Sequence, residues 1–117
     1  FLFASRTETQ GLVLLEALAL SIPVVSTAIM GTRDILEPRL GALVAEDDEE
    51  HFTQQVLRLL RQPDLRNRLR REGREYALGQ WSASVMAQRM EALYRDVIAG
   101  RSPSAGPLGL DRRSQAA

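Results

Sequence analysis

The first 26 residues contain three apolar runs whose lengths and spacing leave few choices of fold. FLFA at 1–4 is a short apolar run bounded by polar residues, and it predicts a buried strand. The segment from about Leu12 to Leu20 is rich in strong helix formers, and PVVS at 23–26 predicts a second strand that begins at Pro23. A strand, a helix and a strand in so few residues form a βαβ unit, in which the strands are parallel and the crossover is right-handed.

The rest of the chain adds one strand and then becomes helical. Thr32 can cap a short helix that ends at Leu36, and GALVA at 41–45 predicts a third strand. A helix over 46–61 is predicted from the acids in its first turn and the arginines near its end. The fold class is therefore predicted to be α/β, with a partial Rossmann-like parallel sheet of about three strands.

Two more helices and a tail complete the predicted order. One helix starts at Pro63 and carries Leu65 and Leu69 on one face. The next opens at Ser82, whose hydroxyl can cap it, and it carries an apolar stripe that consists of Met86, Met90, Leu93 and Val97. The Ser, Pro, Gly and Arg composition over 100–117 predicts a disordered tail.

Composition excludes several classes of function. The 15 basic and 15 acidic residues of the 117-residue chain cancel, so no net field favours nucleic acid, and no nucleic-acid partner is expected. The absence of cysteine excludes disulfides, thiolate metal sites and a thiol nucleophile. The longest apolar region is too short to span a bilayer. Because the chain begins at Phe1 inside a predicted strand, we expect it to be a piece of a longer protein.

A single carboxylate interrupts the first predicted helix. Every residue from Leu12 to Leu20 is apolar except Glu16. A helix that is apolar on all sides is expected to be buried, and a buried carboxylate needs groups that donate hydrogen bonds to it. In one interpretation, Glu16 pairs with Arg6 or Arg33, or lies at a helix end that reaches water. In the other, Glu16 accepts hydrogen bonds from a ligand with two adjacent hydroxyls, such as a ribose.

Topology favours the ligand. In open α/β sheets, ligands bind beyond the carboxyl ends of the strands, where the loops after both predicted strands lie. Gly11 opens the helix, so the backbone amides of Gly11 and Leu12 can receive a phosphate. With a ribose at Glu16 and a second carboxylate at Glu8, these residues describe a nucleotide-sugar pocket.

One long stretch of the chain resembles the C-terminal donor-binding domain of GT-B glycosyltransferases. It is SRTETQGLVLLEALALSIPVVSTAIMGTRDIL, followed by GALV and a helix that begins with acidic residues. More narrowly it is similar to the retaining family 4 type with its E-x7-E motif, because Glu8 and Glu16 stand at that spacing. The resemblance covers roughly 1–99, which it identifies as a partial nucleotide-sugar (donor) binding domain.

The resemblance assigns a role to each site residue. It implies that Glu16 binds the donor ribose and that Glu8, the catalytic candidate, contacts the donor sugar near the reacting centre. Backbone amides of Gly11 and Leu12 would bind the diphosphate, while Thr9 and Gln10 would line the sugar pocket. No metal and no further cofactor is expected, because fixed donors and basic side chains can stabilise the departing diphosphate.

Three residues depart from the family's pattern. Gln10 stands where an aromatic residue is common, which bears on donor choice. Ser21 stands where the family usually has Gly, which bears on a turn. Met30 replaces the first Gly of a usual Gly-Gly pair, which bears on how closely the backbone approaches the sugar.

The resemblance also implies partners that this chain does not contain. A glycan or lipid-linked acceptor would bind a preceding domain, and the phosphate-neutralising basic residues would also lie upstream, so the fragment alone is expected to be inactive. A cytoplasmic location is expected, with peripheral association at the cytoplasmic face of a membrane left open. Two other functions stay open: a sugar-nucleotide epimerase of the same fold, and a non-enzymatic Arg-rich helical interaction module.

Overall fold

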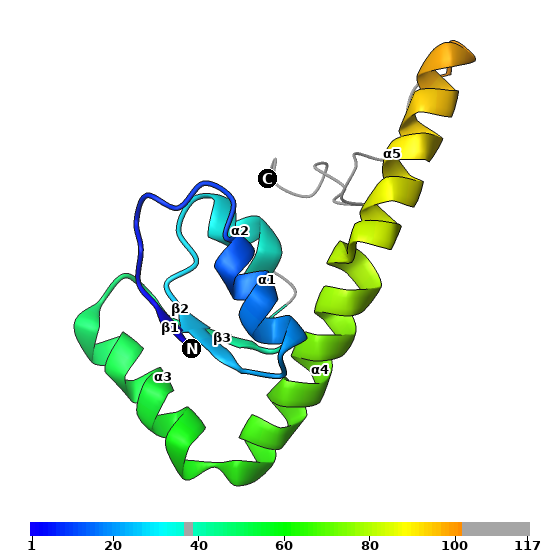
Figure 1. The fold of residues 1–117 in the computed structure, drawn as a ribbon. Helices are drawn as coiled ribbons and strands as arrows, with labels where there is room; N and C mark the ends of the chain where they lie inside the picture. The colour runs from blue at the N-terminus through cyan, green and yellow to red at the C-terminus, as the bar shows by residue number, and fades with distance from the viewer. Residues whose placement is uncertain (37–38, 102–117) are drawn as a thin grey trace. The chain divides into compact units, whose positions relative to one another are not determined.

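The computed structural model describes residues 1–36 and 39–101 and divides the chain into two units, Phe1–Trp81 and the residues from Ser82 onward. The first unit contains a three-stranded parallel sheet in the order β1-β2-β3 (Figure 1). Its strands are β1 (Leu2–Phe3), β2 (Val24–Ser26) and β3 (Ala42–Val44). Helix α1 (Leu12–Ala19) joins β1 to β2, so the predicted βαβ unit and the α/β class are confirmed.

The strands are shorter than the apolar runs that predicted them. Leu2 pairs with Val25 in the β1–β2 register, and Val25 pairs with Leu43 in the β2–β3 register. Pro23 lies just before β2 rather than in it, and its carbonyl accepts a hydrogen bond of 2.7 Å from the Phe1 nitrogen. Proline has no N–H to contribute to a ladder, so its carbonyl alone takes part in the pairing.

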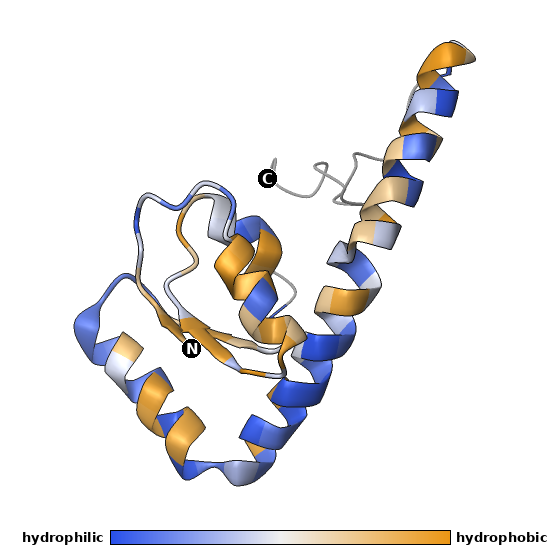
Figure 2. Ribbon diagram, in the orientation of Figure 1, coloured by the Kyte–Doolittle hydropathy of each residue, from blue (hydrophilic) through white to orange (hydrophobic). Residues whose placement is uncertain are grey.

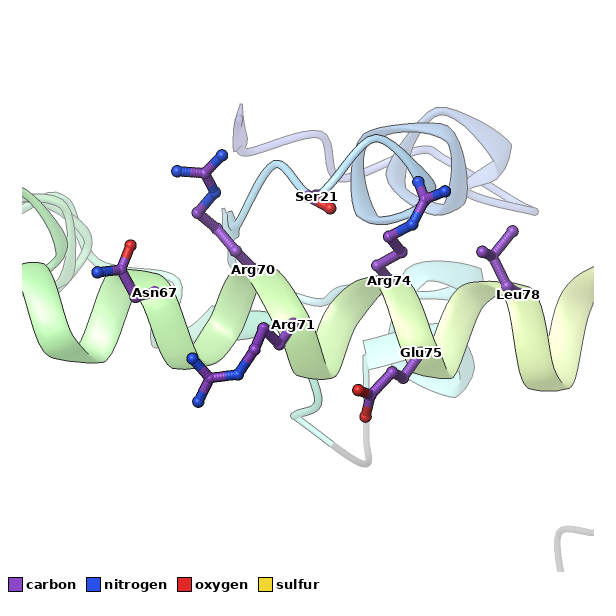
Figure 3. Close-up of a pocket in the computed structure, with 7 residues that line it drawn as sticks. All are labelled: Ser21, Asn67, Arg70, Arg71, Arg74, Glu75 and Leu78. Atoms are coloured by element: carbon purple, nitrogen blue, oxygen red, sulfur yellow. The ribbon is translucent and has the colours of Figure 1, made fainter.

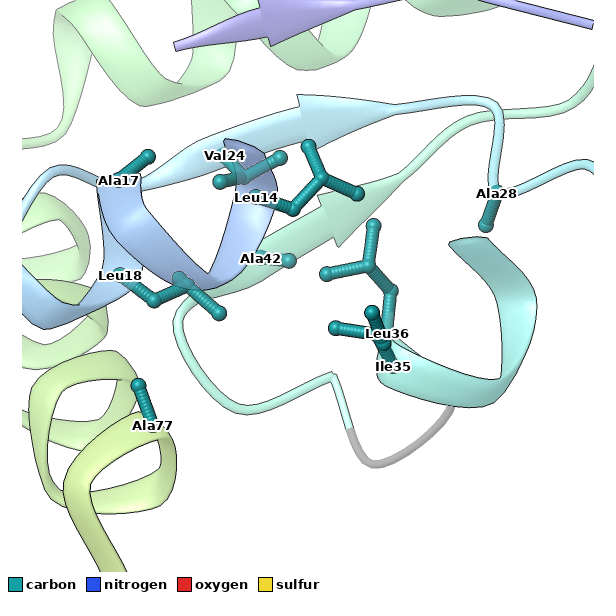
Figure 4. Packing of buried hydrophobic residues seen from close by; sticks show 9 residues of the cluster. All are labelled: Leu14, Ala17, Leu18, Val24, Ala28, Ile35, Leu36, Ala42 and Ala77. Carbon is teal, nitrogen blue, oxygen red and sulfur yellow. The ribbon is translucent and has the colours of Figure 1, made fainter. Parts of the chain in front are cut away.

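Adjacent residues of β2 bury their side chains on opposite faces of the sheet, as the alternation of a strand requires. Val24 belongs to a cluster with α1, α2 (Gly31–Leu36) and part of α4 (Pro63–Trp81), shown in Figure 4. Val25 belongs to a second cluster with α3 (Glu49–Arg61) and the first half of α4. Both faces are therefore covered, which suits a parallel sheet.

Helix α2 ends at Leu36 as predicted, but it begins at Gly31, one residue before the expected cap. The Thr32 hydroxyl is fully buried and donates to the Ile29 carbonyl at 2.7 Å, so it does not accept a hydrogen bond from a helix amide. The prediction that Thr32 caps this helix is therefore wrong. Its hydroxyl instead stabilises the loop that leads into α2, through the hydrogen bond to Ile29.

Helix α3 has acidic residues in its first turn as predicted, but it begins at Glu49 rather than at position 46. Asp48 is the N-cap, and its carboxylate accepts from the His51 amide at 2.7 Å. At the other end, the Arg66 guanidinium donates to the carbonyls of Leu59 and Leu60, both at 3.1 Å. A cation at a helix C-terminus satisfies carbonyls that have no partner within the helix.

Helix α4 contributes to the clusters on both faces of the sheet. Gly73 in the helix and Gly41 before β3 allow the two backbones to approach closely. Leu65 and Leu69 belong to the Val25 cluster, whereas Ala77 belongs to the Val24 cluster. Between them, a Cβ on Gly73 would lie 2.9 Å from the Cα of Gly41 and 2.8 Å from a methyl group of Leu18. The helix therefore touches the backbone before β3 directly, and Figure 2 shows that its remaining surface is largely hydrophilic.

The second unit consists, among the described residues, of α5 (Ala83–Ile98) and its ends. Ser82 is the N-cap as predicted, but its hydroxyl makes no capping bond and contacts the Ser84 hydroxyl at 3.2 Å. None of the α5 residues is buried, and Met90 and Val97 of the apolar stripe are exposed. Most of the predicted tail over 100–117 lies outside the described residues.

Candidate functional site

The predicted site residues gather where β1 and β2 end. The loop after β1 carries Glu8, Thr9 and Gln10 and leads into α1, while the loop after β2 leads into Gly31 at the start of α2. The two loops meet at the backbone: a Cβ on Gly31 would overlap the carbonyl oxygen of Thr9. Both loops therefore lie together at the carboxyl edge of the sheet, where the topology placed the ligand.

Glu8 is held by the loop that follows it. Its Oε1 accepts hydrogen bonds from the Gln10 amide at 2.9 Å and from the Gly11 amide at 3.0 Å. The Gly11 amide, followed by the Gln10 amide, lowers the pKa of the Glu8 carboxyl below its ordinary value of 4.5, because these bonds favour the ionised form. Glu8 is therefore a fixed, half-buried carboxylate at neutral pH.

Gly11 precedes α1 in a conformation that favours glycine. Its φ is 67°, in the left-handed region, and a Cβ there would lie 3.3 Å from side-chain carbons of Thr32 and of Ile35. The Gly11 amide already donates to Glu8, whereas the Leu12 amide donates no hydrogen bond within residues 1–36 and 39–101. Of the two amides predicted to bind a diphosphate, only the Leu12 amide has no hydrogen-bond acceptor among the described residues, and we call it the open amide.

Glu16 is exposed, which corrects the expectation that α1 is buried on all sides. The buried face consists of Leu14, Ala17 and Leu18. Leu12 and Leu20, which share the opposite face with Glu16, are 56% and 70% exposed. An all-apolar helix has no polar stripe, so its sequence does not mark which face is covered.

The arginine partners considered for Glu16 are not found. Arg6 forms an exposed ion pair with Asp47 at 3.0 Å, and Glu16 makes no ion pair in the part of the chain that the structure describes. The carboxylate therefore faces solvent one turn into α1, without a structural partner. Its role as a ribose ligand stays a prediction.

Two of the family departures adopt left-handed backbone conformations. Ser21 has φ 59° and Met30 has φ 56°. Glycine adopts this region without the steric cost that a Cβ brings, which explains why a glycine suits both positions. Thr9 and Gln10 are exposed in the loop beside Met30 and Gly31, so their side chains are accessible to a ligand.

Hollows lie near both ends of β2 in the part of the chain that the structure describes. One of about 390 Å³ lies at the carboxyl end beside α3, with Arg6, Asp47 and Thr27 in its lining. The other, of about 600 Å³, lies near the turn before β2, and Figure 3 shows Arg70 and Arg74 on either side of Ser21. Arg74 also donates to the Ala19 carbonyl at the end of α1. The larger hollow is thus separate from the predicted donor site.

Two features are absent from residues 1–36 and 39–101. No group of three or more His, Asp or Glu side chains is arranged to hold a metal ion. No helix in this part of the chain combines the length and the apolar character needed to cross a bilayer.

The sequence profile of the family "glycosyl transferases group 1" matches residues 1–76, which contain the sheet, α1 and the loop of Glu8. The chain belongs to this family. It is 42% identical over 84 residues to a D-inositol 3-phosphate glycosyltransferase of Frankia alni, covering 69% of this chain and 20% of that protein. A second D-inositol 3-phosphate glycosyltransferase, from Catenulispora acidiphila, is 35% identical over 98 residues, covering 82% and 23%.

A third relative is less similar in sequence. The capsular polysaccharide biosynthesis glycosyltransferase CapM of Staphylococcus aureus is 26% identical over 99 residues, covering 84% of this chain and 26% of that protein. The chain thus spans about a quarter of the length of the curated relatives that it matches. No solved structure matches it.

Proposed function

We propose that this chain is the donor-binding part of a retaining glycosyltransferase, which transfers a sugar from a nucleotide-diphosphate sugar to a glycan or lipid-linked acceptor. The observation that carries the proposal is the order of three groups at one edge of the sheet. The Glu8 carboxylate, the open Leu12 amide and the exposed Glu16 carboxylate follow one another along the loop and the first turn of α1.

The spacing of these groups fits the parts of a nucleotide sugar. Leu12 is the first residue of α1, and Glu16 follows it by four residues, or about 6 Å along the helix axis. Both lie on the exposed face, so a ligand could run along it from the helix N-terminus. A diphosphate at the Leu12 amide would be favoured by the helix dipole, and the adjoining ribose would lie beside Glu16.

Glu8 precedes the proposed diphosphate position along the chain, and we assign the transferred sugar to it. Its carboxylate is ionised and can accept hydrogen bonds from sugar hydroxyls through the oxygen lone pairs that the loop amides leave free. Thr9 and Gln10, exposed in the same loop, would complete this side of the pocket. The proposed chemistry needs no metal, because dipoles and basic groups can stabilise the leaving diphosphate.

The experiment replaces Glu16 with Leu and with Gln in a polypeptide of full family length. Calorimetric titration with UDP, GDP and ADP identifies the bound base and measures its affinity. Each hydrogen bond to a charged group contributes about 1.5–3 kcal/mol, so losing two should weaken binding by about a hundredfold or more. Glu16→Gln, which keeps one acceptor, should fall between wild type and Glu16→Leu.

The matched control is Glu75→Leu, which removes another exposed glutamate from a helix of the same unit. We expect it to leave nucleotide affinity unchanged. We also expect the thermal midpoint of Glu16→Leu to match that of wild type, because the side chain is exposed and has no ion-pair partner among the described residues. Normal nucleotide binding by Glu16→Leu would refute the assignment of the ribose to this carboxylate.

A further inference from the structure

Gly31 occupies a position where no side chain fits. A Cβ built on it would overlap the Thr9 carbonyl oxygen and would lie 3.1 Å from the Gln10 nitrogen. The obstructing atoms belong to the backbone, so they cannot rotate away as the end of a flexible side chain can. The φ angle of Gly31 is not in the left-handed region, and the glycine is therefore required for space rather than for backbone conformation.

The Thr9–Gln10 peptide group, which packs against Gly31, also helps to hold the Glu8 side chain in place. The Thr9–Gln10 peptide supplies the Gln10 amide, and the next peptide supplies the Gly11 amide; both donate to Glu8 Oε1, at 2.9 and 3.0 Å. Gly11 is itself packed against Thr32 of α2, with 3.3 Å from a built Cβ to the Thr32 methyl group. Helix α2 thus supports the Glu8 loop at two successive points.

We infer that Gly31 is a positioning residue for the donor site, because it seats the Thr9–Gln10 peptide against α2 and thereby aims the Glu8 carboxylate. The inference rests on the proposed function for its consequence in catalysis. In this view, the glycine at position 31 allows the loop after β2 to contact the loop after β1. A side chain at position 31 would push the loop outward and move the carboxylate with it.

The test compares Gly31→Ala with Gly73→Ala in a polypeptide of full family length. Both variants add one methyl group at a crowded glycine of the same unit, but Gly73 packs on Leu18 and Gly41, near the amino ends of β2 and β3. Each is assayed well below its melting temperature for kcat and for the KM of the nucleotide sugar. The pKa of Glu8 is followed in both by carboxyl carbon NMR.

We expect Gly31→Ala to lower kcat by about tenfold to a hundredfold, the cost of a misplaced reacting group. The pKa of Glu8 should rise toward its ordinary value of 4.5, because the two amides no longer hold the carboxylate. Gly73→Ala should melt at a lower temperature yet keep both the kcat and the Glu8 pKa of wild type. In a Glu8→Gln background, Gly31→Ala should lower kcat little further, because it acts through Glu8.

A wild-type Glu8 pKa in Gly31→Ala, or an equal change of that pKa in Gly73→Ala, would overturn the inference. If Gly31→Ala does not fold, amide hydrogen exchange on the wild type decides. The amides of Gln10 and Gly11 should be protected at neutral pH and lose protection when Glu8 is protonated, and unprotected amides would refute the seated loop. A protein that binds no nucleotide diphosphate would refute the proposed function, while the NMR and exchange measurements still test Gly31.

Discussion

A single substitution at Ser21 should stabilise the first unit. It follows α1 with φ 59°, and the turn closes with two hydrogen bonds of 2.9 Å, from its own amide to Leu18 and from the Ile22 amide to Ala17. This pair of bonds is the Schellman arrangement, in which glycine is the usual left-handed residue. The Ser21 hydroxyl makes no hydrogen bond within the described residues, so Ser21→Gly removes no contact of that kind.

The size of the effect follows from two opposing terms. The left-handed conformation costs a residue with a Cβ about 1–2 kcal/mol, and glycine is relieved of that cost. Glycine also has more conformational freedom to lose on folding, which costs about 0.5–1 kcal/mol. We therefore expect a net stabilisation of about 0.5–1 kcal/mol, which corresponds to a rise of roughly 2–8 °C in the melting temperature of a domain this small.

Scanning calorimetry of Ser21→Gly and Ser21→Ala in the same background measures this effect. Ser21→Ala keeps the Cβ in the left-handed region, so its melting temperature should match or fall below that of wild type. A rise for Ser21→Ala as large as that for Ser21→Gly would show that backbone strain is not the cause. An unchanged midpoint for Ser21→Gly would show that the turn carries no such cost.

Two further substitutions test the helices. Gly79→Ala should raise the free energy of unfolding by roughly 0.5–1 kcal/mol in urea titration, because a Cβ there would meet nothing within 4 Å and alanine is the better helix former; a loss of stability would contradict the open space at this position. Asp48→Ala should lower the free energy of unfolding by about 1 kcal/mol, since the His51 amide would lose its cap, while Asp48→Asn should recover most of that loss.

The first half of the fold could be predicted because its signals are local. A short apolar run, a glycine before a helix and a proline before the next apolar run determine the order of β1, α1 and β2, and parallel strands follow from the crossover. The same topology places the loops of Glu8 and Gly31 at one edge of the sheet. Family membership was also predictable, because the residues that resemble the family are continuous in the sequence.

The exposed face of α1 and the role of Gly31 could not be predicted in this way. Glu16 stands among apolar residues on all sides of the helix, and only the packing of Leu14 and Leu18 shows which side is covered. The need for Gly31 arises from a carbonyl 22 positions earlier in the chain, at Thr9. The only signal for it in the sequence is a glycine at a loop–helix junction, next to Thr32, whose residue type is a common helix cap.

Glu8 was predicted as a site residue, but the way in which it is held was not. A carboxylate that caps its own following loop has no fixed sequence signature, because the bonds depend on the turn of the chain at Gln10 and Gly11. The left-handed conformation of Ser21 was visible only indirectly, as a departure from glycine at that position. In both cases the missing information is the local path of the backbone.

The contact between Gly41 and Gly73 has a consequence for anyone who diversifies this chain. A Cβ on either residue meets the backbone of the other, so no choice of neighbouring side chains can restore the lost space. A mutational scan of α4 should therefore show that substitutions at position 73 lower the stability, whereas position 79 tolerates most of them. Library designs that vary this helix should hold 41 and 73 constant and place their diversity on its outer face.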